Sequence, residues 1–516
     1  MIAALSLATD LGMSLPLEHG LQSTLVAMRL ADRLGVDPFV ARETYYGCLL
    51  FYVGCTADAE VGARDFEEDI HVHFTPAMFG SRAEILRALS RAMAPSGSAP
   101  GRAARVARGL PRVMRGYRGH LAALCEVGEM LTGRVGLPPA IQRLFPALNE
   151  RWDGKGYPGT LSEEGIPLPV RIVHVARDAT FQASVGGADH AVGVVSERAG
   201  KAFDPQVAAC LVDGAGELLA LDEAGGSAWE RVLELEPAPA VWLAGDAIER
   251  ALRAIGDFAD LVSPYLVGHS SGVTELAAAA AAGGGRLAPD EVLAVRRAAF
   301  VHDVGRVAVP AKIWQKAGPL SADEWERVRL HPYHTERVLI RSSFLGALAP
   351  VASAHHERMD GSGYHRGVVG TVLSASARLL AAADAYHAMT EPRPHRGALS
   401  ADQASELLAG AASAGRLDAD AVASVLEAAG QRVPRIERPA GLTEREAEVV
   451  RLLARGLQTK QIAHALGISV KTADQHVQNA YAKIGVSTRA AAALFAMEHG
   501  LVASGEFPIP TSATGA

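Results

Sequence analysis

Val301-His302-Asp303-Val304-Gly305 follows an apolar stretch and places a histidine and an aspartate side by side. Further residues of these two types stand at intervals around the pair: His269, His331, His355, His356 and Asp384. Neutral imidazole nitrogens and carboxylate oxygens bind divalent Fe, Mn, Ni or Zn ions, and these ligands outnumber the four of an ordinary structural zinc site. We therefore expect two divalent transition metal ions, an arrangement that in hydrolases clamps a phosphodiester around a metal-bound hydroxide.

A second informative stretch, residues 355–364, reads HHERMDGSGY. Together with 301–305 it resembles the HD-GYP family of metal-dependent phosphohydrolases, whose characteristic activity is hydrolysis of cyclic di-GMP. The resemblance covers residues 241–432. It implies that the metal ligands are His269, His302, Asp303, His331, His355, His356 and Asp384. It also implies catalytic roles for Asp303, as the bridge between the metals, and for Arg306, and a substrate-binding set of Arg306, Asp360, Gly361, Gly363 and Tyr364.

Four positions depart from the family pattern. Tyr265 replaces a glutamate that can bind a third metal, which favours a centre of two ions. Arg306 replaces a lysine and keeps the positive charge on a planar group. His365 replaces the proline of the Gly-Tyr-Pro signature, and His387 replaces a second acid near Asp384. The last two changes leave the substrate open between cyclic di-GMP, another cyclic dinucleotide and another phosphate ester.

The first half of the chain repeats the second. Asp10-Leu11 and His19 precede an amphipathic stretch as Asp260-Leu261 and His269 do, and ERWDGKGYP at 150–158 parallels ERMDGSGYH at 357–365. We call residues 1–221 copy one and residues 241–432 copy two. In copy one the dyad positions hold Phe51 and Tyr52, the His331 position holds Leu124, and Leu148-Asn149 replaces the histidine pair. Copy one therefore keeps only His19 and Asp178 of the ligand set, too few for a metal pair.

Both copies should be helical. Residues 247–255 show apolar side chains at spacings of three and four, and no long alternating pattern typical of strands is present. The glycine-rich segments 153–156 and 360–363 are expected to be loops. About 44 extra residues within 60–118 of copy one, including the stretch 94–101, indicate an insertion or loop. The predicted fold is all-α, with tandem HD-type helical bundles, because inward-facing side chains of several helices converge well on a metal pair.

A third module is predicted at 441–505. Thr443 and Glu446 form a capping box at the start of one helix, residues 459–466 form a second, Gly467 makes a turn, and Ser469 caps a third that reaches Lys483. This is a helix-turn-helix pattern. The stretch 442–502 resembles the four-helix LuxR-type DNA-binding domain, which implies that the partner is double-stranded DNA.

The third helix of this module should enter the major groove. Candidate DNA contacts to bases and phosphates are Thr459, Lys460, Lys471, Thr472, Asp474, Gln475, Gln478 and Lys483. Between 441 and 503 seven basic residues face five acidic ones, a weakly basic balance that predicts poor binding by one module alone. We therefore expect a homodimer that presents two modules to paired half-sites.

Composition excludes some classes of protein. The net charge of -7 gives no general attraction to nucleic acid or anionic membranes. The four cysteines form no CxxC pair, and the N-terminus lacks the features of a signal peptide. No apolar run is long enough for a membrane span, so a cytoplasmic protein without membrane contact is expected. Residues 506–516 are predicted to be a disordered tail.

The sequence thus predicts a transcriptional regulator that carries a metal-dependent phosphohydrolase domain acting on a cyclic dinucleotide such as cyclic di-GMP. The alternative is a non-catalytic sensor of nucleotide or metal, in which the HD-type domain only controls the DNA-binding module. The complete ligand set in copy two favours the enzyme, whereas His365 in place of proline, His387 and the attached DNA-binding module favour the sensor.

Overall fold

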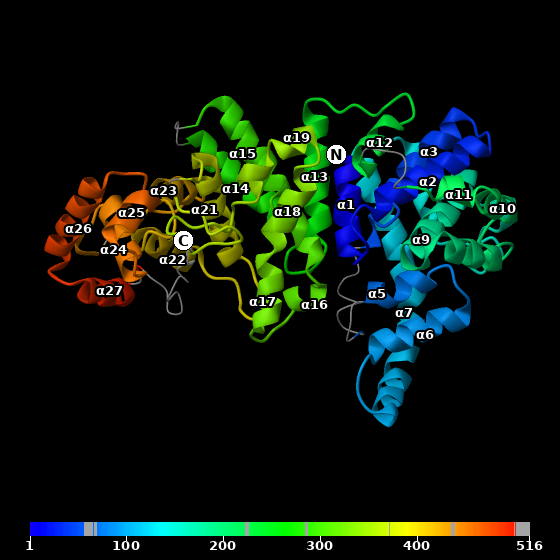
Figure 1. Ribbon diagram of the computed structural model, residues 1–516, viewed down its shortest axis with the longest axis horizontal. Helices are drawn as coiled ribbons and strands as arrows, with labels where there is room; N and C mark the ends of the chain where they lie inside the picture. The colour runs from blue at the N-terminus through cyan, green and yellow to red at the C-terminus, as the bar shows by residue number, and fades with distance from the viewer. Residues whose placement is uncertain are drawn as a thin grey trace, which may run out of the picture. The chain divides into compact units, whose positions relative to one another are not determined.

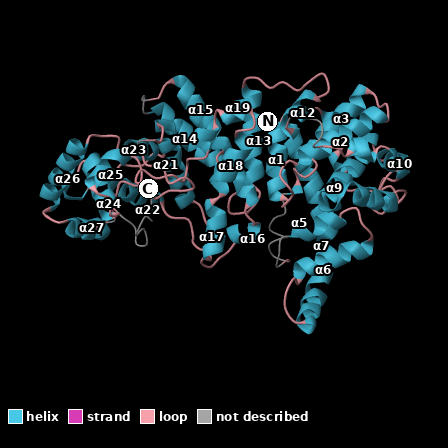
Figure 2. Cartoon of the chain, in the orientation of Figure 1, coloured by secondary structure: helices cyan, strands magenta, loops and turns pink. Residues whose placement is uncertain are grey.

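The computed structural model describes residues 1–55, 66, 70–221, 227–283, 287–370, 372–434, 439–499 and 501. Helices predominate throughout this part of the chain, and only isolated β-bridges accompany them (Figures 1 and 2). The all-α prediction is therefore confirmed. The predicted tail at 506–516 lies outside the described residues. Within them, no helix combines the length and apolar character that a membrane span requires.

The chain forms two compact units. Unit 1 comprises residues 1–270 and 303–347, and unit 2 comprises residues 271–302 and everything from 348 onward. The boundary falls inside copy two, between His302 and Asp303, so that each unit holds part of that copy. The predicted ranges 1–221, 241–432 and 441–505 remain predictions.

Most of unit 1 is copy one, in which α2 packs against both α3 and α9. Apart from the helices of the insertion, copy one contains α1 (Ile2–Gly12), α2 (His19–Arg33), α3 (Pro38–Leu49), α8 (Pro139–Gln142), α9 (Leu168–Arg198), α10 (Pro205–Asp213) and α11 (Ala215–Leu218). The helix α12 (Ala228–Glu234) follows it in unit 1. Local chemistry fixes their ends. Asp37 accepts hydrogen bonds from the amides of Phe39 and Val40 at the start of α3, and Asp10 accepts one from Gly20 in the first turn of α2.

The extra segment of copy one, predicted as an insertion or loop, is an insertion that is largely helical. It contains α5 (Ile70–Phe74), η2 (Thr75–Ala77), α6 (Arg82–Met93) and the start of α7 (Ala99–Arg134). Among the described residues, 78–81 connect η2 to α6 and 94–98 connect α6 to α7, and Ser98 caps α7. The arginine-rich run is helical because its few apolar residues, among them Val106 and Leu110, pack on a small core formed with α5 and α6.

Copy two contributes the dyad segment to unit 1. Here α13 (Asp246–Asp260) confirms the helix predicted over 247–255, and η5 (Val304–Ala308) packs on α1, α13 and α18 (His331–Leu339). Gly305 makes this packing possible, because an added Cβ would lie 2.1 Å from the carbonyl oxygen of His331. The remaining helices are α16 (Ala311–Trp314), α17 (Ala322–Arg329) and α19 (Ser343–Gly346).

Unit 2 holds the other helices of copy two around an alanine- and leucine-rich core. They are α14 (His269–Gly283, whose first two residues belong to unit 1), α15 (Pro289–Val301), α20 (Ala349–Ala352), α21 (Ala375–Thr390), α22 (Ala401–Ser413) and α23 (Ala419–Ala428). The long helix α21 carries Asp384 at its middle and packs against α15, α20, α22 and α23. The dyad follows directly from the end of α15 at Val301.

The C-terminal module, drawn in orange and red in Figure 1, has the four predicted helices. They are α24 (Glu444–Ala454), α25 (Thr459–Ala465), α26 (Val470–Ile484) and α27 (Arg489–Glu498). The predicted capping box of Thr443 and Glu446 is present, Ser469 accepts a hydrogen bond from the amide of Thr472, and Gly467 has a φ of +62° in the turn. The capping box and the cap at Ser469 rest on contacts between residues three positions apart, which explains why the sequence predicts them well.

Candidate functional site

Three of the expected ligands share one orientation. The Nδ1 atoms of His302, His331 and His355 lie 2.7, 2.6 and 2.7 Å from the carbonyl oxygens three residues earlier. A carbonyl oxygen can only accept, so each Nδ1 carries the proton and each Nε2 presents a lone pair. This is the tautomer that a metal-ligating histidine needs, and the backbone bond also fixes the plane of the ring.

In unit 1, His269 and His331 of the predicted ligand set lie next to Asp303. Its carboxylate oxygens lie 3.5 Å from Nε2 of His269 and 3.3 Å from Nε2 of His331, and all three side chains are buried. The guanidinium of Arg306 forms an ion pair with the same carboxylate at 2.7 Å and extends to within 3.4 Å of His269 Nε2. Arg306 therefore contacts the expected bridging ligand directly, a contact that the sequence did not predict.

Unit 2 gathers the other ligands around Asp384. Its carboxylate oxygens lie 3.8 Å from His302 Nε2 and 3.8 Å from His356 Nδ1. The His355 ring meets the His302 ring edge-on at 4.8 Å and lies 4.3 Å from the ring of His356. Tyr364 stacks on His356 at 4.7 Å. Every residue of the predicted ligand set thus lies beside another member of the set within its own unit.

Burial sets the protonation of these groups. It lowers the pKa of His331, although hydrogen bonding to Asp303 opposes the shift. A neutral imidazole is the form that binds a metal ion. Asp260, which the sequence marked only as part of the repeat, accepts hydrogen bonds from the amide and hydroxyl of Ser270 and thereby holds the turn that carries His269. Burial raises the pKa of Asp260 to about 6.

Hydrogen bonds to the side chain of Glu357 fix the signature loop, residues 357–365. The carboxylate of Glu357 accepts hydrogen bonds from the amides of Arg366 and Val368, just as Glu150 of copy one accepts them from Gly159 and Thr160. Both glycine-rich segments are loops, as predicted.

The predicted substrate-binding residues of this loop have structural contacts of their own. Asp360 accepts hydrogen bonds from the amide and hydroxyl of Ser362. Gly361 has a φ of +75°, and an added Cβ on Gly363 would lie 2.4 Å from the Cα of Glu357. These contacts shape the loop, and contact with a substrate remains a prediction.

In copy one, an arginine side chain packs on the residues that stand at the dyad positions. Arg177 lies over the rings of Phe51 and Tyr52, at 5.0 and 4.3 Å from their centroids, and donates to the carbonyl oxygen of Cys48 at 2.7 Å. Asp178 is one of the two residues of the predicted ligand set that copy one retains. Its two carboxylate oxygens accept hydrogen bonds from Nη1 of Arg198 at 2.7 and 2.6 Å. The carboxylate is thus neutralised by an arginine, which agrees with the predicted loss of metal binding in copy one.

The candidate DNA-binding residues lie mainly on the exposed face of α26. Lys471, Thr472, Asp474, Gln475 and Gln478 are exposed, whereas Ala473, Val477 and Ala480 are buried in the module. On α25, Lys460 is exposed and Thr459 half-buried. Lys483 is different, because its ammonium group binds Glu446 at 2.6 Å and the carbonyl oxygen of Gly441 at 3.2 Å. This ion pair inside the module competes with the predicted phosphate contact of Lys483.

One contact reaches from the DNA-binding module to the signature loop, inside unit 2. Arg455, directly after α24, donates from Nη1 to the carbonyl oxygen of Asp360 at 2.7 Å. Arg451, on the same helix, is buried against Gly415 of copy two. Sequence reasoning missed both arginines as interdomain contacts, because no local pattern distinguishes them from surface residues of a helix.

Comparison with known families agrees with this geometry. The HD domain family matches residues 114–207 and 253–421, together about half of the chain. The chain belongs to the HD domain family. Because the HD domain is matched twice, the predicted tandem arrangement is confirmed. Residues 440–496 match the luxR family of bacterial regulatory proteins, so the HD copies of this chain precede a LuxR-type DNA-binding domain.

Similar HD domain proteins are phosphodiesterases. The chain is 28% identical over 414 residues to a 3'3'-cGAMP-specific phosphodiesterase 3 of Vibrio cholerae, covering 78% of this chain and 88% of the relative. It is 38% identical over 120 residues to a cyclic di-GMP phosphodiesterase response regulator of Xanthomonas campestris pv. campestris, 23% of this chain and 32% of the relative. A crystal structure of a cyclic GMP-AMP specific phosphodiesterase of V. cholerae shares the fold, with a TM-score of 0.56, 22% identity and coverage of 83% and 96% of the two chains.

Proposed function

We propose that this protein is a DNA-binding regulator in which copy two hydrolyses a cyclic dinucleotide with the help of two divalent metal ions. The observation that carries the proposal is the shared orientation of His302, His331 and His355, whose Nδ1 atoms are bound to backbone carbonyls. A buried histidine that served only packing would not need the same tautomer three times. The phosphodiesterase relatives support the reaction class, and those named for cyclic di-GMP and 3'3'-cGAMP support the substrate class.

In this proposal the seven residues predicted from the sequence hold the ions: His269, His302, Asp303, His331, His355, His356 and Asp384. The ions, when bound, supply a hydroxide at neutral pH and positive charge for the phosphate oxygens. The chain supplies orientation, because Arg306 fixes the carboxylate of Asp303 and Asp260 holds the turn before α14. Arg306 also places a planar cation beside the ligands, where it stabilises the charge of a phosphate.

The second candidate function is a sensor that binds the nucleotide without turnover. The contact of Arg455 with the signature loop favours this function. Because Arg455 directly follows α24, a rearrangement of the loop by a bound nucleotide reaches the DNA-binding module through this hydrogen bond. The two candidates share the metal site and the DNA-binding module and differ only in product formation. In both, the protein acts as a homodimer on paired DNA half-sites.

The test uses the purified full chain and a matched pair of variants. His269→Ala removes a ligand of copy two, and His19→Ala removes its buried counterpart in copy one. We expect elemental analysis to find transition metal in the wild type and in His19→Ala, and at least a tenfold lower content in His269→Ala. Incubation with cyclic di-GMP and 3'3'-cGAMP should give linear products only where metal is retained.

Equal metal content in His269→Ala and the wild type would refute the assignment of the ligands. Metal and nucleotide binding without product would refute the enzyme and support the sensor.

A further inference from the structure

Unit 1 contains a cavity of about 900 Å³, lined mostly by copy one and in part by residues of copy two between 307 and 327. Its walls include Phe51 and Tyr52, Leu124, and the pair Leu148-Asn149. In the repeat these positions correspond to the dyad, to His331 and to the histidine pair of copy two. The cavity therefore occupies the degenerate counterpart of the metal site, with most of the metal ligands replaced by apolar side chains.

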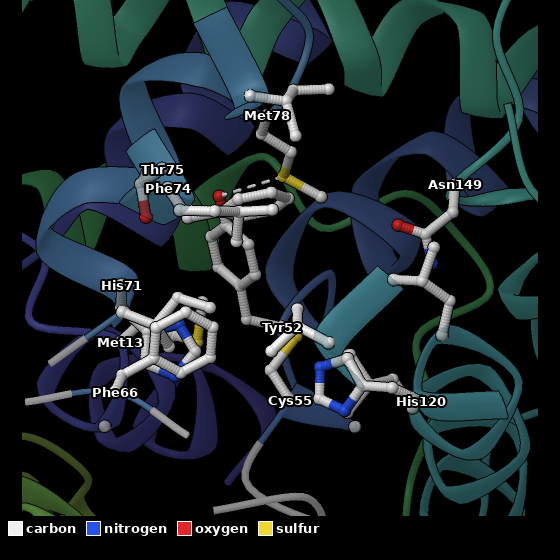
Figure 3. Close-up of a pocket in the computed structure, with 18 of the residues that line it drawn as sticks. Met13, Tyr52, Cys55, Phe66, His71, Phe74, Thr75, Met78, His120 and Asn149 are labelled. Atoms are coloured by element: carbon white, nitrogen blue, oxygen red, sulfur yellow. Dashed lines mark hydrogen bonds between the residues drawn. The ribbon is translucent and has the colours of Figure 1, made fainter. Parts of the chain in front are cut away.

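The insertion of copy one closes the cavity from the other side. Phe74, Met78 and Leu89, from α5, the residue after η2, and α6, lie on the wall together with residues of α7. Figure 3 shows Tyr52 and Met78 meeting there, with the Tyr52 hydroxyl 3.8 Å from the sulfur of Met78. Pockets of several hundred cubic ångströms with mainly apolar walls and a few polar groups are typical of sites for small organic molecules. The insertion thus encloses a volume that fits such a molecule.

The charged residues on the lining have a positive balance. The basic ones are Arg82, Arg112, Arg118, Arg151, Lys155, Lys312 and Arg327, and the acidic ones are Glu150, Asp323 and Glu324. Groups of both signs are already engaged: Glu150 accepts backbone amide bonds from 159–161 and Glu324 binds Lys316 at 2.6 Å, while Arg151 and Lys155 bind Asp153 at 3.2 and 3.5 Å. An anionic group is favoured over a cationic one in such surroundings.

We infer that copy one binds a small amphipathic organic anion, with an apolar aromatic or aliphatic body and one acidic group, in this cavity. The apolar walls contact the body, and the basic side chains on the insertion, Arg82 and Arg118 among them, attract the acidic group. The inference concerns the cavity of unit 1, which residues of copy two such as Lys312 and Arg327 also line, and it does not depend on turnover in copy two. It gives the degenerate copy a binding function in place of the lost metal site.

The test uses 8-anilinonaphthalene-1-sulfonate, an aromatic anion that fluoresces in apolar surroundings, on the purified full chain. We expect saturable binding at one site per chain. Leu124→Trp, which fills the cavity, should lower the affinity at least tenfold, and Val185→Trp, at an exposed position outside the lining, should leave it unchanged. Met114→Trp on the lining repeats the filling at a position that is 48% exposed and tolerates a larger side chain.

The charge is tested separately. Arg82→Ala combined with Arg118→Ala should weaken the sulfonate at least tenfold and change binding of the neutral N-phenyl-1-naphthylamine less than twofold. In wild type, hydrogen exchange should show protection by the sulfonate confined to the segments that line the cavity, namely residues 51–55, α5 to α7, 145–157 and 307–327. Wild-type affinity in both filled variants, or protection elsewhere, would overturn the site. Equal weakening of the neutral probe would overturn the preference for an anion.

Discussion

Replacing Arg177 by methionine tests how copy one keeps its interior folded without metal ions. Arg177 is 2% exposed, lies over two aromatic rings and donates to the carbonyl oxygen of Cys48. Desolvated cation–π contacts contribute about 2 kcal/mol. A hydrogen bond from a charged donor contributes about 1.5–3 kcal/mol. Removing a buried charge recovers part of its desolvation cost, and methionine fills most of the volume. We expect the free energy of unfolding to fall by about 2–4 kcal/mol.

The assay follows from the distribution of tryptophan. All five tryptophans of the chain lie at positions 152, 229, 242, 314 and 325, which belong to unit 1. Urea denaturation followed by tryptophan fluorescence therefore reports on the unit that contains Arg177. Arg143→Met, at an exposed arginine of the same copy, is the control and should change stability by no more than about 0.5 kcal/mol. Equal midpoints for the two variants would refute a structural role for the buried guanidinium, as would a loss of metal from copy two in Arg177→Met.

Further predictions concern DNA binding, pH and coupling. Gln475→Ala should reduce the discrimination between bases at one position of the DNA site by about 1–3 kcal/mol. Lys471→Ala should weaken binding to all DNA sequences and lower the slope of log affinity against log salt concentration by about one. Fluorescence anisotropy measures both, and no change in either variant would exclude α26 as the element that contacts the bases. Burial lowers the pKa of His174 to about 4, below its unfolded value, so stability should fall by up to about 3 kcal/mol as pH drops from 6.5 to 4. His174→Gln should flatten this dependence in urea titrations, and an unchanged profile would contradict it. Arg455→Met should abolish any effect of cyclic dinucleotide on DNA affinity, expected to be 5- to 150-fold in wild type; a retained effect would show that coupling takes another route.

Local rules explain most of what the sequence predicted correctly. The capping box of Thr443 and Glu446 and the cap at Ser469 depend on residues three positions apart, so they are readable before any fold is known. The exposed face of α26 follows from helical periodicity in the same way. The duplication and the ordered histidines and aspartates of copy two are also properties of the linear chain, and they led to the HD domain and LuxR-type assignments.

Long-range contacts decided what the sequence left open or mispredicted. The sequence left the extra segment of copy one open as an insertion or loop, and α7 is helical there because its apolar residues meet α5 and α6. Arg177 pairs with rings more than 120 positions away, and Lys483 binds Glu446 across the module. Neither pairing can be predicted from a periodic pattern in the sequence. Residue types and their order thus determined the kind of chemistry, while only the path of the chain determined which groups meet, because partners far apart in sequence are brought together by packing alone.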